Sequence, residues 1–253
     1  MILVDSSCNY ERRITSVFLQ KHLNAINDTF GWLEDDLSRW TMVACFNGYI
    51  SLMDFAMEFV RSYSDQYFEE GIVSACEGEV FVDCGAFIGD SVIPFVELCN
   101  SQNVSYKSIF AFEPDKDAFA KLRKLVNNYH DLNIIPMGVG DFCGDAYITS
   151  SFGASRLSKE GQGESVRITT IDEYLKHENV SFIKMDLEGG EMAALRGAKN
   201  TIAKLHPKLA ICIYHKPEDW ITIPSFIRSL NPDYKLYCRG YFNNLSEIVL
   251  YCI

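Results

Sequence analysis

The segment Glu79-Val-Phe-Val-Asp-Cys-Gly-Ala-Phe-Ile-Gly-Asp-Ser91 is the most informative stretch of this sequence. Its apolar, β-branched beginning predicts a buried strand, and Gly85 and Gly89 predict a sharp turn before a helix over 90–99. Glycine lets the backbone of such a turn come close to a ligand, because no Cβ stands in the way. An ordinary strand-turn-helix corner, in which glycine only relieves backbone strain, is the alternative interpretation.

Polar side chains flank this turn. Asp90 or Ser91 is placed to cap the helix that follows. Asp83, at the end of the strand, sets the charge preference, because a carboxylate repels pyrophosphate and suits a ligand with an amino group or a cationic centre. S-adenosylmethionine carries both, so the segment predicts a site for this cofactor.

Composition and length are typical of one domain with an added segment. The chain has 253 residues, 48% of them hydrophobic, and a formal net charge of −11, which argues against a nucleic-acid partner. Its nine cysteines form no CxxC pair and no zinc-type cluster, which indicates reduced thiols and no structural metal. Since the sequence begins without a signal peptide and has no membrane span, we expect a cytoplasmic protein.

Two kinds of pattern divide the chain. Residues 1–75 show helical periodicity, including a run over 52–67, and predict a helical cap or lid. Residues 76–253 alternate short β-branched runs with helical stretches, which predicts an α/β fold with a mostly parallel sheet flanked by helices. Only Arg239 to Ser246 separate the last two strands, so the C-terminal strand should be antiparallel. The expected strands are 80–84, 108–112, 133–137, 145–149, 166–170, 182–186, 209–214, 234–238 and 247–252, and the expected helices are 90–99, 116–128, 171–176, 192–205 and 220–230.

Acidic residues recur where the predicted parallel strands end. In an open parallel sheet, ligands bind at this edge, near the point where the strand order reverses. Each carboxylate taken singly can be a turn or helix-cap residue. Together, and with the glycine turn opening the series, they indicate a ligand site. They are Asp83, Glu113, Asp141 and Asp186.

Four motifs in order along the chain resemble the FkbM family of S-adenosylmethionine-dependent methyltransferases. They are Asp-Cys-Gly-Ala-Phe-Ile-Gly-Asp-Ser (83–91), Phe-Glu-Pro-Asp (112–115), Thr-Ile-Asp-Glu-Tyr (170–174) and Ile-Lys-Met-Asp-Leu-Glu-Gly-Gly-Glu (183–191). The resemblance covers roughly residues 78–253, and Gly190 stands where many relatives carry Ala. It implies a class I methyltransferase (Rossmann-like) fold and methyl transfer to oxygen, often to a hydroxyl of a sugar or a secondary metabolite.

The resemblance also implies roles for single residues. Asp83, Gly85 and Gly89 would line the methionine end of the cofactor. Glu113 would bind the ribose and Asp141 the adenine. The whole expected cofactor site consists of Asp83, Gly85, Ala86, Phe87, Gly89, Asp90, Ser91, Glu113, Pro114, Gly140, Asp141, Phe142 and Asp186.

Methyl transfer to an alcohol requires a group that removes the hydroxyl proton. Asp186, Glu188 and His215 follow neighbouring predicted strands and are the candidates. His215 is our first choice, because the pKa of histidine is ordinarily near neutrality. A histidine that is merely hydrogen-bonded at a strand end is the alternative. In a minor hypothesis, the same three side chains hold a divalent metal that orients a sugar diol.

Substrate contacts are expected outside the strand ends. Ser155 and Arg156 belong to a long polar segment over 150–163, which we expect to be a loop that meets a polyhydroxylated substrate, or a solvated hairpin tip. Tyr241 either stacks on a sugar or packs. The sequence thus favours an O-methyltransferase acting on a sugar, glycan or glycosylated metabolite. The alternatives are an NAD-dependent oxidoreductase, which would want Gly-x-Gly-x-x-Gly, and a non-catalytic S-adenosylmethionine-binding protein.

Overall fold

The chain forms two compact units in a computed structural model that describes residues 14–51, 60–125, 128–151, 154–158, 163–241 and 246–253. We call residues 67–211, together with Ile253, the central unit. The described residues up to 66 and those within 212–252 make up the composite unit. The composite unit thus combines an N-terminal and a C-terminal segment. The first boundary between the units lies between Gln66 and Tyr67, whereas the sequence pattern suggested a change at 75.

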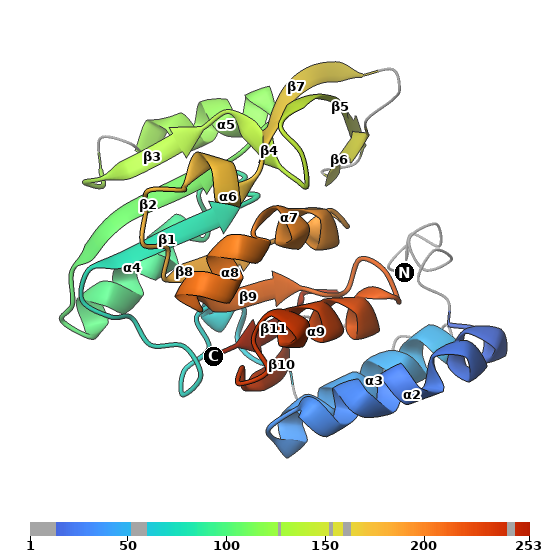
Figure 1. Cartoon of the computed structure of the whole chain (residues 1–253). Coiled ribbons are helices and arrows are strands. Elements are labelled where there is room, and N and C mark those ends of the chain that lie inside the picture. The colour runs from blue at the N-terminus through green and yellow to red at the C-terminus, as the bar shows by residue number, and fades with distance from the viewer. Residues whose placement is uncertain (1–13, 52–59, 126–127, 152–153, 159–162, 242–245) are drawn as a thin grey trace, which may run out of the picture. The chain divides into compact units, whose positions relative to one another are not determined.

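The central unit is built on a parallel sheet with the strand order β9-β8-β1-β2-β3 (Figure 1). Its strands are β1 (Glu79–Cys84), β2 (Tyr106–Phe112), β3 (Leu132–Ile135), β8 (Phe182–Met185) and β9 (Lys208–Cys212). From β1 the chain builds the sheet in one direction through β2 and β3, while β8 and β9 extend it in the other. The strand order therefore reverses between β1 and β8, which is where ligands of such sheets bind. The predicted mostly parallel α/β sheet is confirmed.

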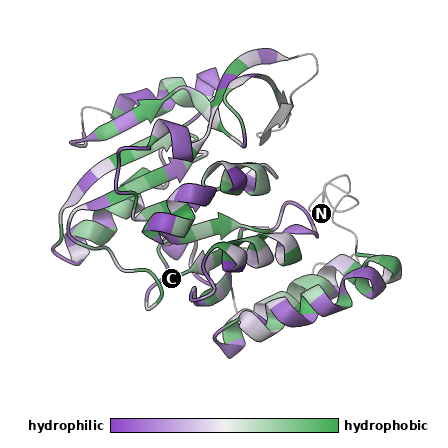
Figure 2. Ribbon diagram, viewed as in Figure 1, coloured by the Kyte–Doolittle hydropathy of each residue, from purple (hydrophilic) through white to green (hydrophobic). Residues whose placement is uncertain are grey.

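Helices cover the two faces of this sheet. They are α4 (Val92–Ser101), α5 (Lys116–Leu122), α6 (Ile171–Tyr174), α7 (Glu191–Gly197) and α8 (Lys199–Leu205). Right-handed crossovers place the helices after β1 and β2 on one face and those after β8 on the other, and Figure 1 shows α4 and α5 behind the strands and α6 and α8 in front. Every residue of β1 and β8 is buried. Figure 2 shows β9 as largely hydrophobic and α6 as largely hydrophilic, as expected for a covered sheet and an outer helix.

A second sheet in the central unit has the order β4-β7-β5-β6. Its strands are β4 (Met137–Val139), β5 (Gly144–Ser151), β6 (Ala154–Ser158) and β7 (Glu164–Thr169). The single strand predicted over 133–137 is wrong, because Pro136 separates β3 from β4 and proline donates no hydrogen bond to a ladder. The loop predicted over 150–163 is also wrong in part, since β6 pairs antiparallel with β5.

The predicted helices differ in detail from the observed ones. The helix expected over 192–205 is two helices, α7 and α8, which meet at Ala198. The helix expected over 116–128 ends with α5, and a 3-10 turn, η2 (Arg123–Leu125), follows it. Of the run over 52–67, residues 52–59 lie outside the described residues, and the rest holds the 3-10 turn η1 (Tyr63–Asp65).

The composite unit joins N-terminal helices to C-terminal strands. Its elements are α2 (Ser16–Trp32), α3 (Asp36–Ser51), α9 (Asp219–Leu230), β10 (Leu236–Gly240) and β11 (Ile248–Cys252). Strand β10 pairs antiparallel with β11, which confirms the antiparallel C-terminal strand. Helix α2 contacts α9, and α3 contacts β10. Among the residues that the structure describes, no helix is long and apolar enough to cross a bilayer.

A buried arginine ties α3 to β10 within the composite unit. The Arg239 guanidinium donates from Nη2 to Asp35 Oδ2 at 2.6 Å and from Nη1 to Ser38 Oγ at 2.9 Å. The backbone N–H of Cys238 also donates to Ser38 Oγ, at 2.8 Å. Burial alone would raise the pKa of Asp35, but the hydrogen bonds from Arg239 and Ser38 outweigh it and lower the pKa to about 2.

We predict that Asp35→Asn lowers the free energy of unfolding by about 1 kcal/mol at pH 7, a value reduced by the partial exposure of this carboxylate. The pKa of Asp35 is lower in the folded protein than in the unfolded chain. The stabilisation is therefore complete above about pH 4 and is lost as the pH falls towards 2. Urea unfolding at pH 7, 4 and 3 measures this trend.

Asp36→Asn is the matched control, because Asp36 forms an exposed pair with Arg39 on the same helix, and its side chain is 87% exposed. It should change the free energy of unfolding by less than about 0.5 kcal/mol. Equal effects of the two substitutions would contradict the assigned role of Asp35.

Candidate active site

The turn after β1 is fastened to the end of β2. The backbone N–H groups of Gly85 and Ala86 both donate to the carbonyl oxygen of Phe112, at 3.1 and 2.9 Å. Gly85, Phe87 and Gly89 have φ angles of 82°, 44° and 89°, in the left-handed region. That conformation is costly for a bulky side chain such as Phe87, and such strain is concentrated at functional sites. The turn thus lies at the switch point between β1 and β8. Its strained conformation requires stabilising contacts from the surrounding protein.

Close packing leaves no room for a Cβ at either glycine of the turn. A Cβ on Gly85 would collide with the carbonyl oxygen of Asp186, which follows β8. A Cβ on Gly89 would collide with the side chain of Leu125. Close approach of the turn to neighbouring protein therefore explains both residues, and the glycines alone do not prove that a ligand approaches.

Asp83 lies behind the turn in a fully buried ion pair. Its Oδ1 is 3.0 Å from Lys184 Nζ, and the two residues are register partners on β1 and β8. Lys184 Nζ also donates to the carbonyl oxygen of Gly85 at 2.7 Å. The charge of Asp83 is therefore already balanced, and its side chain is 0% exposed. Its geometry provides support for the turn rather than direct contact with a cationic ligand.

The expected cap of α4 has a different arrangement. The helix begins at Val92, and Ser91 occupies the N-cap position. The Ser91 side chain makes no cap hydrogen bond, and Asp90 is not the N-cap residue. Its hydroxyl donates instead to Asp83 Oδ2, which adds a second partner to that carboxylate. Asp90 is exposed.

Glu113 lies directly after β2, next to the glycine turn. It follows the last residue of β2, precedes Pro114 and is only 6% exposed. Its carboxylate accepts hydrogen bonds from the backbone N–H of Phe87 at 2.8 Å and of Asp115 at 2.7 Å. Burial raises the pKa of Glu113 to about 7, although these two bonds favour the ionised form. A carboxyl group that links the two strand ends thus changes its charge near neutral pH.

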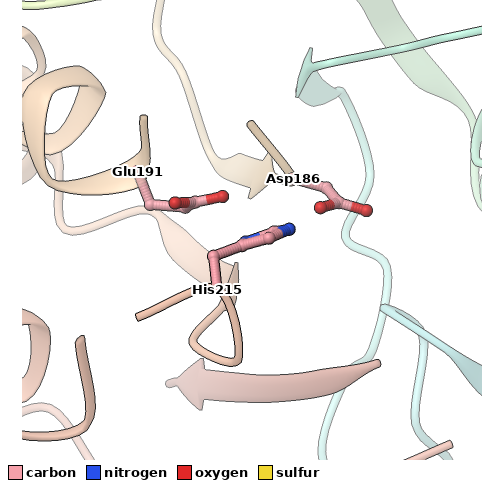
Figure 3. A group of neighbouring side chains, drawn as sticks. All are labelled: Asp186, Glu191 and His215. Atoms are coloured by element: carbon pink, nitrogen blue, oxygen red, sulfur yellow. The ribbon is translucent and has the colours of Figure 1, made fainter. Parts of the chain in front are cut away.

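Asp186 directly follows β8 and is held by a residue that the sequence did not single out. The Tyr67 hydroxyl donates to Asp186 Oδ2 at 2.9 Å. Beside it, the buried Glu191 accepts at Oε1 from the backbone N–H of Leu187 at 2.8 Å. Figure 3 shows Asp186 and Glu191 among the side chains near the end of β8. The hydrogen bonds that Glu191 accepts from Leu187 and Gly189 make it a support of the loop before α7.

The other two catalytic candidates lie in different units. Glu188 is in the central unit, two residues after Asp186, and its φ of 52° adds to the strained backbone at the switch point. His215, also labelled in Figure 3, belongs to the composite unit, where its ring lies 4.1 Å from that of Tyr214.

The expected adenine side of the site follows β4, which belongs to the second sheet. Gly140 is buried, and its N–H donates to the carbonyl oxygen of Thr169 at 2.9 Å. Asp141 is exposed. Phe142 is partly buried and packs against the hydrophobic cluster of Ala146, Ile148, Val166 and Ile168. Asp141 was expected to follow the third strand of one parallel sheet, whereas it follows β4 of the second sheet, because the chain leaves the main sheet after β3.

The expected substrate residues belong to different elements. Ser155 and Arg156 lie on β6, opposite Ser150 and Thr149 of β5, so they belong to a strand and not to a free loop. Tyr241 is 2% exposed, and its hydroxyl hydrogen-bonds with that of Tyr251 at 2.6 Å, all within the composite unit. This environment favours the packing alternative for Tyr241.

Comparison with known proteins identifies the family of the chain. The family described as the Methyltransferase FkbM domain matches residues 83–235. The crystal structure of Methyltransferase FkbM from Methylobacillus flagellatus KT is similar with a TM-score of 0.80 and 26% sequence identity, over 94% of this chain and 60% of that chain. Our chain therefore spans less than two thirds of that protein's length.

More distant solved structures are also methylases. An rRNA methylase from Streptococcus thermophilus has a TM-score of 0.44 and 17% identity, covering 70% of this chain and 86% of its own. A putative rRNA methylase from Clostridium thermocellum has a TM-score of 0.47 and 12% identity, covering 76% and 95%. Neither likeness is close enough to indicate a substrate. No curated protein matches the chain significantly.

We predict that Gly85→Ala lowers the free energy of unfolding by at least about 2 kcal/mol, because Ala is strained at a φ of 82° and its Cβ meets the Asp186 carbonyl. Denaturant unfolding measures the loss. Gly31→Ala is the control: Gly31 lies in helix α2, and a Cβ there has nothing within 4 Å. The control should be neutral or stabilising by up to about 1 kcal/mol, and a similarly small effect at Gly85 would refute the proposed close packing.

Proposed function

The chain belongs to the family of FkbM methyltransferase domains and has the class I methyltransferase fold; from this premise we propose that it transfers a methyl group from S-adenosylmethionine to a hydroxyl oxygen of a sugar, glycan or glycosylated metabolite. One observation supports the proposal above the others: the strained turn after β1 is joined to the buried Glu113 carboxyl at the switch point of a parallel sheet. A nicotinamide-dependent dehydrogenase, the rival enzyme, is disfavoured by the family membership.

We place the ribose of S-adenosylmethionine at Glu113. A carboxylate at the end of the second strand can accept hydrogen bonds from both ribose hydroxyls. Glu113 is already oriented by two backbone N–H groups, so little conformational freedom is lost when the ribose binds. In this proposal the adenine lies towards Asp141, and the methionine end lies between the turn and Asp186. Asp83 and Lys184 support the turn from behind.

We propose His215 as the base that removes the hydroxyl proton. The support comes from chain connectivity. Strands β8 and β9 run parallel with Met185 opposite Ile211, so the chain leaves both strands at the same edge of the sheet. His215 follows Ile211 by four residues, which an extended chain spans in about 14 Å or less. Within that reach a base can act on an oxygen that attacks the methyl group in line. Asp186 and Glu188 are the other candidates at this edge.

The direct test is transfer of a labelled methyl group from S-adenosylmethionine to a panel of nucleotide sugars, glycans and small alcohols. Labelled product from a hydroxylated acceptor is the expected result. Cofactor binding without turnover on any acceptor would favour the non-catalytic alternative. Tight binding of NAD with no binding of S-adenosylmethionine or S-adenosylhomocysteine would overturn the proposal. Parallel assays with chelator and with added magnesium or manganese determine whether a metal assists.

We predict that S-adenosylhomocysteine binds more tightly as the pH rises through about 7, by up to about tenfold between pH 6 and pH 8, because the ionised form of Glu113 accepts from the ribose hydroxyls. Titration calorimetry across this range measures the effect. Glu113→Gln should bind weakly and lose this pH dependence. An unchanged pH profile in the variant would show that another group is responsible.

Ionisation of Glu113 also changes the stability of the free protein, and this stability depends on pH in the opposite way to the affinity. Since the pKa of Glu113 is higher in the folded protein than in the unfolded chain, its contribution to stability is greatest at low pH and is lost as the pH rises through about 7. Stability and affinity therefore respond oppositely to pH at this residue, which separates cofactor binding from a general loss of structure.

We predict that His215→Ala slows methyl transfer by about 10²-fold or more and changes the dissociation constant of S-adenosylhomocysteine by less than about twofold. Single-turnover rates and calorimetry measure the two quantities. His130→Ala is the control, because His130 is an exposed residue of the central unit that pairs with Asp131. Full turnover in His215→Ala would exclude the histidine as the base.

A further inference from the structure

Tyr67 connects two parts of the site that are far apart in the sequence. Its hydroxyl donates to Asp186, 119 residues away, at 2.9 Å. The face of its ring receives the Lys184 ammonium, which lies 4.9 Å from the ring centroid. That ammonium in turn holds Asp83 and the carbonyl oxygen of Gly85. One side chain thus touches both the carboxylate after β8 and the cation that supports the glycine turn.

The Tyr67 hydroxyl contacts the side chain of Asp186, while other contacts hold the backbone of this residue. The Asp186 N–H donates to the carbonyl oxygen of Cys84 at 3.1 Å, and its own carbonyl lies where a Cβ on Gly85 would be. The backbone of Asp186 is therefore fixed. A phenol hydroxyl that donates to Oδ2 restricts the rotation of the Asp186 carboxylate.

Tyr67 is also buried and has a strained backbone conformation. It is only 8% exposed, and its φ of 69° is unfavourable for an aromatic residue. Such a conformation persists where the surrounding contacts hold it. The family match begins at residue 83, so Tyr67 lies outside it.

We infer that Tyr67 is a positioning residue, which orients the Asp186 carboxylate towards the methionine end of the methyl donor. The inference rests on the proposed function, because it requires that Asp186 meets the donor. Tyr67 itself touches no reacting atom in this scheme. Its effect on donor binding passes through Asp186.

A double-mutant cycle tests this dependence, with the dissociation constants of S-adenosylmethionine and S-adenosylhomocysteine measured by calorimetry. Tyr67→Phe removes the hydroxyl and keeps the ring over Lys184. It should weaken binding by about fivefold to tenfold, as expected for one hydrogen bond to a carboxylate. In the Asp186→Asn background, the same substitution should change binding by less than twofold. A merely structural role would give equal losses in both backgrounds.

Tyr106→Phe is the matched control, because Tyr106 is another buried tyrosine of the central unit, and its hydroxyl donates to the His130 carbonyl at 3.1 Å. It should leave donor binding unchanged. Equal losses from Tyr67→Phe in the two backgrounds, or no loss in the wild-type background, would overturn the inference while the proposed function stands. Failure of the wild-type protein to bind either compound would overturn the proposed function, and the inference with it.

Discussion

A buried carboxylate and a buried ammonium face each other across β1 and β8, and the geometry of the site depends on this pair. Asp83 and Lys184 are register partners at the point where the strand order reverses, and both side chains are almost inaccessible to water. Removing one charge would leave the other buried without its counter-ion, at a cost on the order of 3–5 kcal/mol. Because Lys184 also binds the Gly85 carbonyl, the pair aligns the two strands and holds the first residue of the turn.

This pairing changes the electrostatic explanation of the site. The acidic residues at the strand ends suggested a uniformly anionic edge that attracts a positively charged donor. Asp83 is neutralised internally, and Glu113 has a pKa of about 7, so it is only partly ionised at neutral pH. The carboxylates therefore have separate tasks: Asp83 supports the turn, Glu113 accepts hydrogen bonds, and Asp186 is oriented by Tyr67.

The sequence was sufficient for features encoded by local pattern, and insufficient for those that depend on contacts across the chain. The strands and the glycine turn follow from apolar runs and from punctuation by glycine, so their order and their place at the sheet edge were predictable. Pro136 in an otherwise β-like run was a visible signal for the division between β3 and β4. Nothing local indicated that Asp83 pairs with Lys184, or that Tyr67 reaches Asp186, because each contact spans about a hundred residues or more. The polar composition of the segment with β6 likewise concealed a strand that is defined by its pairing with β5.

The composite unit shows why the N-terminal helices are part of the architecture and not an appendage. The family match covers residues 83–235, yet the Methylobacillus flagellatus methyltransferase is similar over 94% of this chain. That extent must include most of the described N-terminal residues. Within the unit, Arg239 of β10 is buried against Asp35 and Ser38 at the beginning of α3, so the C-terminal strands need the N-terminal helices to satisfy a buried guanidinium. The two segments outside the match therefore depend on each other within the composite unit.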